Sequence, residues 1–366
     1  MLLNKNQQVF FELLRAGLWE QEVQLSEYKD VDFSVIMKMA EEQSVVGLVT
    51  AGLEHVVDVK VPQVWTLQFI GSTLQIEQRN KAMNEFVARL ISLLRKSDVY
   101  ALLVKGQGIA QCYEKPLWRA SGDVDLFLSD TNYEKAKKEL IPLATNVEKE
   151  FQLIKHLGMT IDGFSVELHG TLRSRLTKRI DREIDKVQNE CFLNGEVRSV
   201  EFKSSNGSKV QVFLPGPNQD VIFVFTHILH HLFIEGIGLR QICDWCRLLW
   251  MYRGKIEQNQ LEKHLKAMGL MSEWKAFASL AVDFLGMEEN AMPFYDARFK
   301  VKGSRLMDFI LETGNFGHNR MMEGEGKMKV LARRTSDAFK MMRIFPVDAW
   351  KMYFGMIRTG LILRAE

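Results

Sequence analysis

The feature that most constrains the fold is a short segment in which aliphatic and other residues alternate. In Gly122–Asp130 (GDVDLFLSD), every second residue from Val124 to Leu128 is aliphatic and falls on one face. Asp123 and Asp125 fall on the opposite face. Successive side chains of a β-strand point to opposite sides, so a period of two indicates a strand with one buried face.

More extended sequence surrounds this predicted strand. Tyr100–Lys105 is a short apolar run before glycines, which is typical of a buried strand. Further along, Asp162-Gly163 and Asn206-Gly207 each join two extended runs, and such dipeptides favour two-residue hairpin turns. The runs predicted to form these two hairpins are 151–161, 164–170, 197–203 and 209–214.

Helical spacing of apolar residues dominates the rest of the chain. The sequence up to about Asp98 fits helices throughout, and Val61–Lys96 has room for one long helix or two. Shorter helices are expected from about Gly108 and from about Thr131. Beyond Pro215-Gly216-Pro217, the clearest break in the chain, helical spacing returns and continues to the end.

These patterns together predict an α+β protein. A small mixed β-sheet with flanking helices lies between N-terminal and C-terminal helical regions. The 366 residues exceed a small single domain and indicate two or three compact units. We expect an N-terminal helical region over 1–98, an α/β core over 99–215 and a C-terminal helical domain over 216–366.

The composition is that of an ordinary folded protein. Lys and Arg number 48 against 46 Asp and Glu, which gives a formal net charge of +2. This balance disfavours nucleic-acid binding driven by electrostatics, because that requires clustered Lys and Arg. Four cysteines in a chain of this length indicate reduced thiols and not a disulfide framework.

No part of the sequence predicts export or a membrane span. The N-terminus lacks the basic region, apolar core and cleavage site of a signal peptide. The most apolar stretch, Val221–Ile234, is shorter than the roughly 20 residues of a spanning helix and contains His227, His230 and His231. We therefore expect a cytoplasmic protein without a membrane partner, and we interpret the three histidines as a partly buried structural cluster.

One constellation of residues indicates chemistry: a strand, a Lys-Gly turn, a helix, and a second strand with Asp-x-Asp. Asp123 and Asp125 occupy positions i and i+2 of a strand, so they point the same way, roughly 7 Å apart along the chain. Two carboxylates so placed can share hard divalent cations, and Mg²⁺ favours carboxylates together with phosphate oxygens and water. Two such ions hold the attacking and leaving oxygens of a phosphoryl displacement. The pattern predicts a site for Mg²⁺ (or Mn²⁺).

Flanking elements complete this predicted site. Glu167, in the extended run FSVELHG, is the candidate third carboxylate. Gly106 lets the backbone approach a phosphate closely, and the helix that follows directs free N–H groups at the anion. Lys105 and Arg119 are candidate phosphate contacts. Alternatively, Lys105 only covers a sheet end, and Arg119 only pairs with a carboxylate.

The order of these motifs resembles the nucleotidyltransferase superfamily typified by DNA polymerase β. It is more closely similar to a bacterial branch of uncharacterised nucleotidyltransferases, in which a Lys-Gly turn precedes an Arg and an Asp-Ile-Asp strand. In that branch, a later strand carries an acidic residue and a His. The matching residues are Lys105-Gly106, Arg119, Gly122–Asp125 and Val166–His169 within a core over about 99–170, with a looser echo over Leu239–Asp244.

The resemblance implies an enzyme that transfers a nucleoside monophosphate from an NTP to an acceptor hydroxyl and releases pyrophosphate. The acceptor, a small molecule or a protein, is not identified by the sequence. The implied metal ligands are Asp123, Asp125 and Glu167. Asp125 or Glu167 is also implied to help deprotonate the acceptor hydroxyl. The residues implied to hold the triphosphate are Lys105, Gly106 and Gln107.

Three further residues are assigned to the cleft by the resemblance. His169 is placed to orient a carboxylate or the nucleotide, although a lone histidine is more often structural. Arg240 and Asp244, four residues apart on one helix, either project into the cleft or form a salt bridge with each other. The nearby Cys243 and Cys246 have no second cysteine pair to complete a zinc site, which favours core packing.

Two alternatives to this enzyme remain open. Gln107 stands where the superfamily usually has a glycine or a serine, and its bulk motivates a catalytically inactive module that binds a nucleotide or a partner on the same scaffold. A polymerase or nuclease that ignores sequence is disfavoured by the balanced charge. The locally basic segment Lys327–Arg343 is its one motivation.

Overall fold

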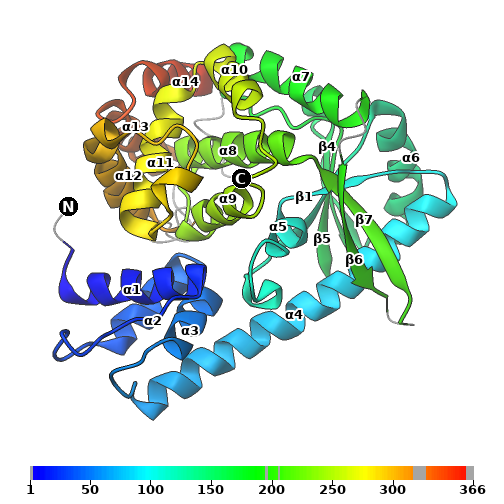
Figure 1. Cartoon of the computed structure of the whole chain (residues 1–366). Coiled ribbons are helices and arrows are strands. Elements are labelled where there is room, and N and C mark those ends of the chain that lie inside the picture. Colours follow the sequence, from blue (N-terminus) through cyan, green and yellow to red (C-terminus); the bar gives the residue numbers. More distant parts are fainter. Residues whose placement is uncertain (1–2, 194–196, 205–206, 316–326, 360–366) are drawn as a thin grey trace. The chain divides into compact units, whose positions relative to one another are not determined.

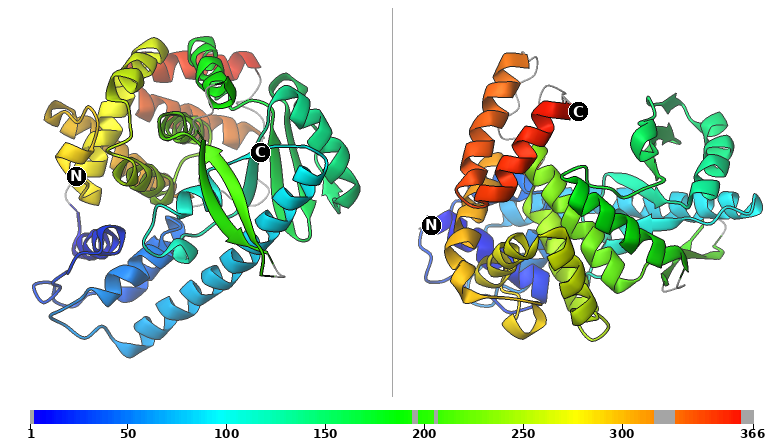
Figure 2. Two further views of the ribbon diagram at one scale, coloured as in Figure 1. Left: turned by 45° about the vertical axis from the view of Figure 1, so that its right-hand side comes forward. Right: turned by 90° about the horizontal axis from the view of Figure 1, so that it is seen from above.

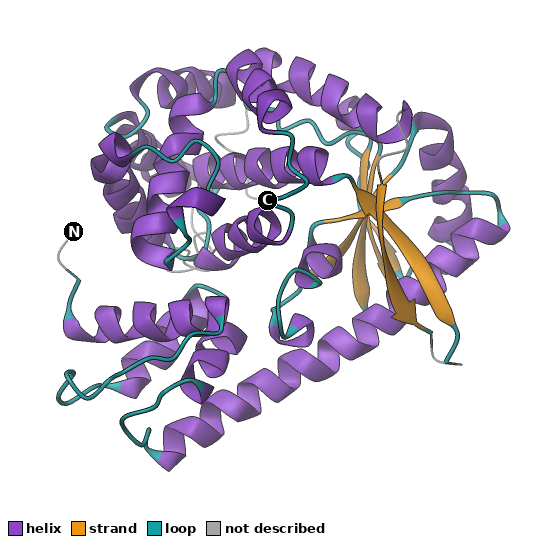
Figure 3. Ribbon diagram, viewed as in Figure 1, coloured by secondary structure: helices purple, strands orange, loops and turns teal. Residues whose placement is uncertain are grey.

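The structure, a computed structural model, describes residues 3–193, 197–204, 207–315 and 327–359. In these ranges it contains fourteen α-helices and a single sheet of seven strands, which Figure 3 shows in orange among the helices. The α+β class predicted from the sequence is confirmed. None of the helices in the described ranges combines the length and the apolar character that crossing a bilayer requires.

The chain forms two compact units, each assembled from segments that are separate in the sequence. We call them the helical unit and the sheet unit. The helical unit comprises Met1–Phe69, Ser174–Glu183 and Val224–Glu366, and the sheet unit comprises Ile70–Arg173 and Ile184–Phe223. The boundaries 1–98, 99–215 and 216–366 stay a prediction.

The sheet unit contains all seven strands in the order β3-β4-β5-β2-β1-β7-β6. The neighbours β2 and β5 are parallel, and so are β1 and β7, whereas the other pairs are antiparallel. The sheet is therefore mixed, as the sequence predicts. The strands are β1 (Leu102–Val104), β2 (Asp123–Phe127), β3 (Asn146–Val147), β4 (His156–Ile161), β5 (Phe164–His169), β6 (Val197–Lys203) and β7 (Lys209–Pro215).

Both predicted hairpins are present. β4 and β5 pair antiparallel on either side of Asp162 and Gly163, whose φ angles of 50° and 80° are those of a tight primed turn. β6 and β7 form the second hairpin, which Figure 2 shows in green. Gly207 has a φ of 81°, while Asn206 of the predicted turn lies outside the described residues.

Five helices belong wholly or partly to the sheet unit. The stretch that fitted one helix or two forms a single helix of 34 residues, α4. The helix expected from about Gly108 begins two residues earlier, and the one expected near Thr131 begins at Asp130. The helices are α4 (Gln63–Lys96), α5 (Gly106–Ala110), α6 (Asp130–Leu140), α7 (Lys178–Leu193) and α8 (Pro217–Ile234), with short 3-10 turns at Pro116–Trp118, Ile141–Leu143 and Gln152–Ile154.

One face of the sheet packs against α4 and α6 (Figure 1). Val87 and Ile91 of α4 and Tyr133 of α6 belong to the same buried core as Leu126 of β2 and Val166 of β5. Because side chains alternate along a strand, the residues between these apolar positions point to the opposite face. The acidic residues predicted for the site lie on that opposite face.

The helical unit is built around buried aromatic rings. Phe225 of α8 lies 5.5 Å from Trp245 and 4.9 Å from Trp274, measured between ring centroids. Cys243 and Cys246 are fully buried in α9, so the predicted core packing is confirmed. The other helices of this unit are α1 (Lys5–Trp19), α2 (Phe33–Glu42), α3 (Val46–Glu54), α9 (Leu239–Met251), α10 (Gln258–Met268), α11 (Met271–Leu285), α12 (Lys300–Thr313), α13 (Lys327–Met342) and α14 (Pro346–Thr359), with 3-10 turns at Glu289–Ala291 and Ala297–Phe299.

Candidate functional site

Three carboxylates converge on the face of the sheet that α4 and α6 leave uncovered. In the parallel pair of β2 and β5, Asp125 stands directly beside Glu167. Asp123 lies two residues before Asp125 on the same face. One carboxylate oxygen from each of the three residues lies within 4.8 Å of the other two. The side chains predicted as metal ligands are therefore brought together, although their role stays a prediction.

The three carboxylates differ in their exposure. Asp125 is buried, with 2% of the residue exposed, whereas Asp123 and Glu167 are half-buried. An isolated ionised carboxylate in the position of Asp125 is costly unless a cation or hydrogen-bond donors compensate its charge.

Lys105 provides this compensation. Its Nζ lies 2.7 Å from Oδ1 of Asp125. Burial works to lower the pKa of Lys105, but the carboxylates of Asp125, Glu167 and Asp123 outweigh it and raise that pKa above its usual value. The ammonium group is therefore held in its charged form.

The backbone at Lys105 is unusual. It follows β1 with a φ of 57° and a ψ of −143°, a sparsely populated combination for a residue with a side chain. Gly106 comes next with a φ of 33°, and a Cβ atom there would lie 3.3 Å from the carbonyl oxygen of Asp123. The Lys-Gly turn thus runs close to the strand that carries the acidic residues.

Gln107 and Arg119 belong to a hydrogen-bond network beside this turn. Nε2 of Gln107 donates to Oδ1 of Asn80 at 3.2 Å, and Oγ of Ser121 donates to Oε1 of Gln107 at 3.0 Å. Nη1 of Arg119 donates to the same Ser121 hydroxyl at 2.9 Å. The side chain of Gln107 is buried, and both its nitrogen and its oxygen are engaged in this network. Phosphate binding by either residue stays a prediction.

Two histidines flank Glu167. Nε2 of His169 lies 2.8 Å from Oδ1 of Asp125 and 3.3 Å from Oε2 of Glu167. Nε2 of His156, at the start of β4, lies 3.2 Å from the same Oε2. The histidine rings are 4.9 Å apart between centroids. His169 is thus in direct contact with two of the three carboxylates.

These contacts shift both titrations. Burial alone raises the pKa of Glu167, but hydrogen bonds from His156 and His169 reverse the effect and hold the pKa of this carboxyl well below its usual range. Burial alone lowers the pKa of His169, but hydrogen bonds to Asp125 and Glu167 outweigh it and raise that pKa. The ionised carboxylate and the protonated imidazole therefore stabilise each other.

A pH dependence of stability follows for the metal-free protein. The folded pKa of His169 is raised, so its contribution is complete below the unfolded value of about 6.5 and is lost as the pH rises through the folded value. The folded pKa of Glu167 is lowered, so its contribution is complete above about pH 4.3 and is lost on acidification. In the presence of a chelator, the destabilisation caused by His169→Gln should be about 2 kcal/mol between these two pH values and smaller at pH 9. Denaturant unfolding across the pH range measures it, and a difference that does not change with pH contradicts the assignment.

His156 is the site residue that the sequence analysis missed, although a signal for it exists. The two-residue turn at Asp162 and Gly163 fixes the register of the hairpin. Counting outward from this turn places His156 opposite His169, as the structure has it.

Two residues predicted for the cleft belong to a different unit from the three carboxylates. Arg240 and Asp244 lie on α9 in the helical unit. Their assignment to the cleft stays a prediction.

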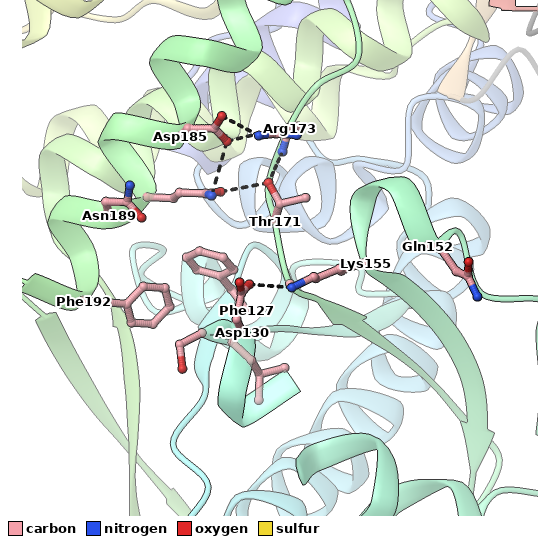
Figure 4. Close-up of a pocket in the computed structure, with 13 residues that line it drawn as sticks. Phe127, Asp130, Gln152, Lys155, Thr171, Arg173, Asp185, Asn189 and Phe192 are labelled. Carbon is pink, nitrogen blue, oxygen red and sulfur yellow. Dashed lines mark hydrogen bonds and ion pairs between the residues drawn. The ribbon is translucent and has the colours of Figure 1, made fainter. Parts of the chain in front are cut away.

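A cavity of about 730 Å³ opens in the sheet unit beyond the C-terminal ends of β2 and β5 (Figure 4). Its charged side chains are paired: Asp185 accepts two hydrogen bonds from Arg173, at 2.6 and 2.7 Å, and Lys155 lies 2.9 Å from Asp130. Residues with amide, hydroxyl and aromatic side chains make up most of the remaining wall: Phe127, Ser129, Gln152, Thr171, Gln188, Asn189 and Phe192.

The fold and the site together define a class. A small mixed sheet, a Lys-Gly turn after its first strand and three carboxylates on two neighbouring strands are the arrangement of a nucleotidyltransferase-like protein. A family model described as "Uncharacterised nucleotidyltransferase" matches residues 29–286. The chain belongs to this family, which confirms the resemblance found in the sequence. Comparison with curated proteins and with solved structures finds no match.

Proposed function

We propose that the protein is a metal-dependent nucleotidyltransferase that transfers a nucleoside monophosphate from an NTP to an acceptor hydroxyl. The observation that carries the proposal is the convergence of the Asp123, Asp125 and Glu167 carboxylate oxygens within 4.8 Å of one another. Membership of a nucleotidyltransferase family supports the reaction class. The predicted cytoplasmic location rests on the sequence alone and stays a prediction.

The carboxylates fit a hard divalent cation. Three oxygens this close together match the preference of Mg²⁺ (or Mn²⁺) for carboxylates. We propose Asp123, Asp125 and Glu167 as its ligands. When bound, the ion would neutralise charge on the phosphate oxygens and on the leaving pyrophosphate.

The residues of the chain would then bind and orient the reactants. The acceptor oxygen forms a bond to the α-phosphorus, the bond from that phosphorus to the bridging oxygen breaks, and pyrophosphate leaves. The proton of the acceptor hydroxyl passes to a carboxylate oxygen of Asp125 or Glu167. Lys105 brings a positive charge to the triphosphate, while Arg119 and the backbone of Gly106 and Gln107 support the phosphates. This division follows from what phosphoryl transfer requires, namely positioning and electrostatic stabilisation.

We propose that the cavity beyond β2 and β5 receives the acceptor. Phe127 lines it and lies two residues after Asp125 on the same face of β2, about 7 Å along the strand. The charges in its wall are already paired, which favours a polar, uncharged small molecule over an anion. Phe192 is 40% exposed and offers an apolar surface for such a molecule.

This placement of the acceptor predicts a selective effect of Phe192→Ala. The acceptor KM should rise about tenfold, the loss expected for one aromatic contact, while the KM for the NTP stays unchanged. Steady-state kinetics with each substrate varied in turn measures both. An equal rise of the two KM values would remove the cavity from the proposal.

The proposed activity is tested by incubating the protein with Mg²⁺, each of the four NTPs and a set of polyhydroxylated acceptors. Release of pyrophosphate together with a mass increase of one acceptor by a nucleoside monophosphate is the expected result. If calorimetry detects no Mg²⁺-dependent binding of any NTP, both the enzyme and the nucleotide-binding module are excluded.

A second candidate function is a catalytically inactive module that binds a nucleotide or a partner on the same scaffold. One observation favours it: Oδ1 of Asp125 already contacts Lys105 at 2.7 Å and His169 at 2.8 Å, so the protein neutralises this carboxylate by itself. If the protein binds NTP but releases no pyrophosphate with any of the acceptors, the result supports the module and not the enzyme.

A further inference from the structure

A second group of ligand atoms lies beside the three carboxylates and includes nitrogen donors. It consists of His156, Glu167 and His169, one atom of each lying within 4.8 Å of the other two. The group shares Glu167 with the acidic triad. It differs in chemistry, because two of its three donors are imidazoles.

The spacing of the ligand atoms in this group also fits binding to one ion. Oε2 of Glu167 lies 3.2 Å from Nε2 of His156 and 3.3 Å from Nε2 of His169. Without an ion, Nε2 of His169 also makes a charge-assisted hydrogen bond to Oδ1 of Asp125 at 2.8 Å. Two ligand atoms bound to one tetrahedral ion at about 2.0–2.1 Å lie about 3.3–3.4 Å apart.

The backbone holds these ligands without need of the ion. His156 and His169 face each other in the antiparallel register of β4 and β5, at the end of the hairpin opposite the tight turn at Asp162 and Gly163. Ligands on paired strands are positioned more firmly than ligands on loops. The side chains of His156, Glu167 and His169 remain 20%, 29% and 12% exposed, so an ion from solution can reach them.

We propose that His156, Glu167 and His169 form a binding site for a divalent transition metal of the zinc class. Imidazole nitrogens suit Zn²⁺ and Co²⁺, whereas Mg²⁺ demands oxygen ligands. Three protein ligands leave a coordination position open for water or for an oxygen of a substrate. Binding requires Nε2 of both histidines as lone-pair donors, so the proton on each Nε2 passes to solvent or, in a neutral ring, to Nδ1. Asp125 then loses its hydrogen bond from Nε2 of His169 and keeps its contact with Lys105, 2.7 Å away.

This site does not depend on nucleotidyl transfer. It adds a nitrogen-rich position next to the carboxylates proposed for Mg²⁺, and the two positions are separable by their metal preference. A protein that binds a zinc-class ion at the histidines without transferring a nucleotide would retain this inference and lose the proposed function.

The test uses the full chain, stripped of metal and titrated with Co²⁺, whose visible absorption reports nitrogen coordination. We expect one equivalent to bind, to be displaced by Zn²⁺ and to resist a large excess of Mg²⁺. His156→Gln should weaken Co²⁺ binding by at least about a hundredfold, more than the loss of an outer-shell partner causes. His156 lies at the start of β4 and is partly exposed, so this variant should fold normally, which circular dichroism checks.

His55→Gln serves as the matched control. It removes a histidine that pairs with a glutamate elsewhere in the chain, and it should leave Co²⁺ affinity unchanged. Absence of Co²⁺ binding by the wild-type protein, or equal affinity in His156→Gln, would overturn the proposal and leave an ordinary histidine–carboxylate network. If the protein fails this test but still releases pyrophosphate in Mg²⁺, the proposed nucleotidyltransferase activity stands and the zinc-class site does not.

Discussion

Asp123→Asn should lower the Mg²⁺-dependent turnover of NTP by about a thousandfold or more, roughly 4 kcal/mol of transition-state stabilisation. The substitution keeps the shape of the side chain and removes one of three negative charges that lie within 4.8 Å of one another. Asp123 is the first residue of β2 and is half-buried, so the fold should depend on its charge far less than on that of buried Asp125. Pyrophosphate release and the melting temperature measure the two effects separately.

Asp162→Asn is the matched control for this experiment. It removes the same charge in the same unit, at the exposed turn between β4 and β5, where asparagine also accepts a positive φ. Its turnover should equal that of the wild-type protein. Unchanged activity of Asp123→Asn, or an equal loss in both variants, would count against the carboxylate site.

Local signals in the sequence predict the sheet well. The alternation around β2 and the Asp-Gly turn between β4 and β5 each act over a few residues, so neither depends on the rest of the fold. The turn also fixes which residues of the hairpin face each other, and this register places His156 opposite His169. The placement of Asp123 and Asp125 on one face could be predicted for the same reason, because both residues belong to one strand.

The contacts between distant segments could not be predicted in this way. The pairing that brings Asp125 beside Glu167 joins β2 to β5, two parallel strands separated by β3 and β4 in the chain. No turn sets the register of such a pair, and only the assembled core decides it. The sequence suggested Glu167 through its residue type and family resemblance. It gave no indication that Lys105 contacts Asp125, since that contact depends on the strained backbone after β1.

The sequence also did not predict which segments of the chain make up each compact unit. Ser174–Glu183 belongs to the helical unit although the residues on both sides belong to the sheet unit. Hydrophobic periodicity reports which face of an element is buried but not which neighbour buries it. Periodicity therefore suggested three regions that follow one another along the chain. In the structure, each of the two units combines segments from separate parts of the chain.

Lys105→Met should destabilise the metal-free protein by about 3 kcal/mol, and Mg²⁺ should restore much of the loss. In the absence of metal, Lys105 is the cation that lies 2.7 Å from the buried carboxylate of Asp125, whose side chain is 1% exposed. Breaking a buried ion pair typically costs about 3–5 kcal/mol. Without Lys105, the carboxylate of Asp125 keeps its contact with His169, 2.8 Å away, which places the expected loss at the lower end of this range. The divalent ion proposed at Asp123, Asp125 and Glu167 would supply positive charge in place of the ammonium group. The variant should therefore bind Mg²⁺ more tightly than the wild-type protein, in which the ammonium group competes for the same oxygen.

Thermal unfolding with chelator and with saturating Mg²⁺ distinguishes this role from an ordinary loss of an ion pair. Lys137→Met is the matched control, because Lys137 pairs with Glu150 at 2.8 Å in the same unit and contacts none of the three carboxylates. Its destabilisation should be the same in both conditions. That of Lys105→Met should shrink in Mg²⁺, because a ligand of the folded state stabilises it more the more tightly it binds. If Mg²⁺ fails to narrow the gap between Lys105→Met and the wild-type protein, the ion does not bind at Asp125. In that case the Lys105–Asp125 pair is a structural ion pair, and the inactive module becomes the better description of the site.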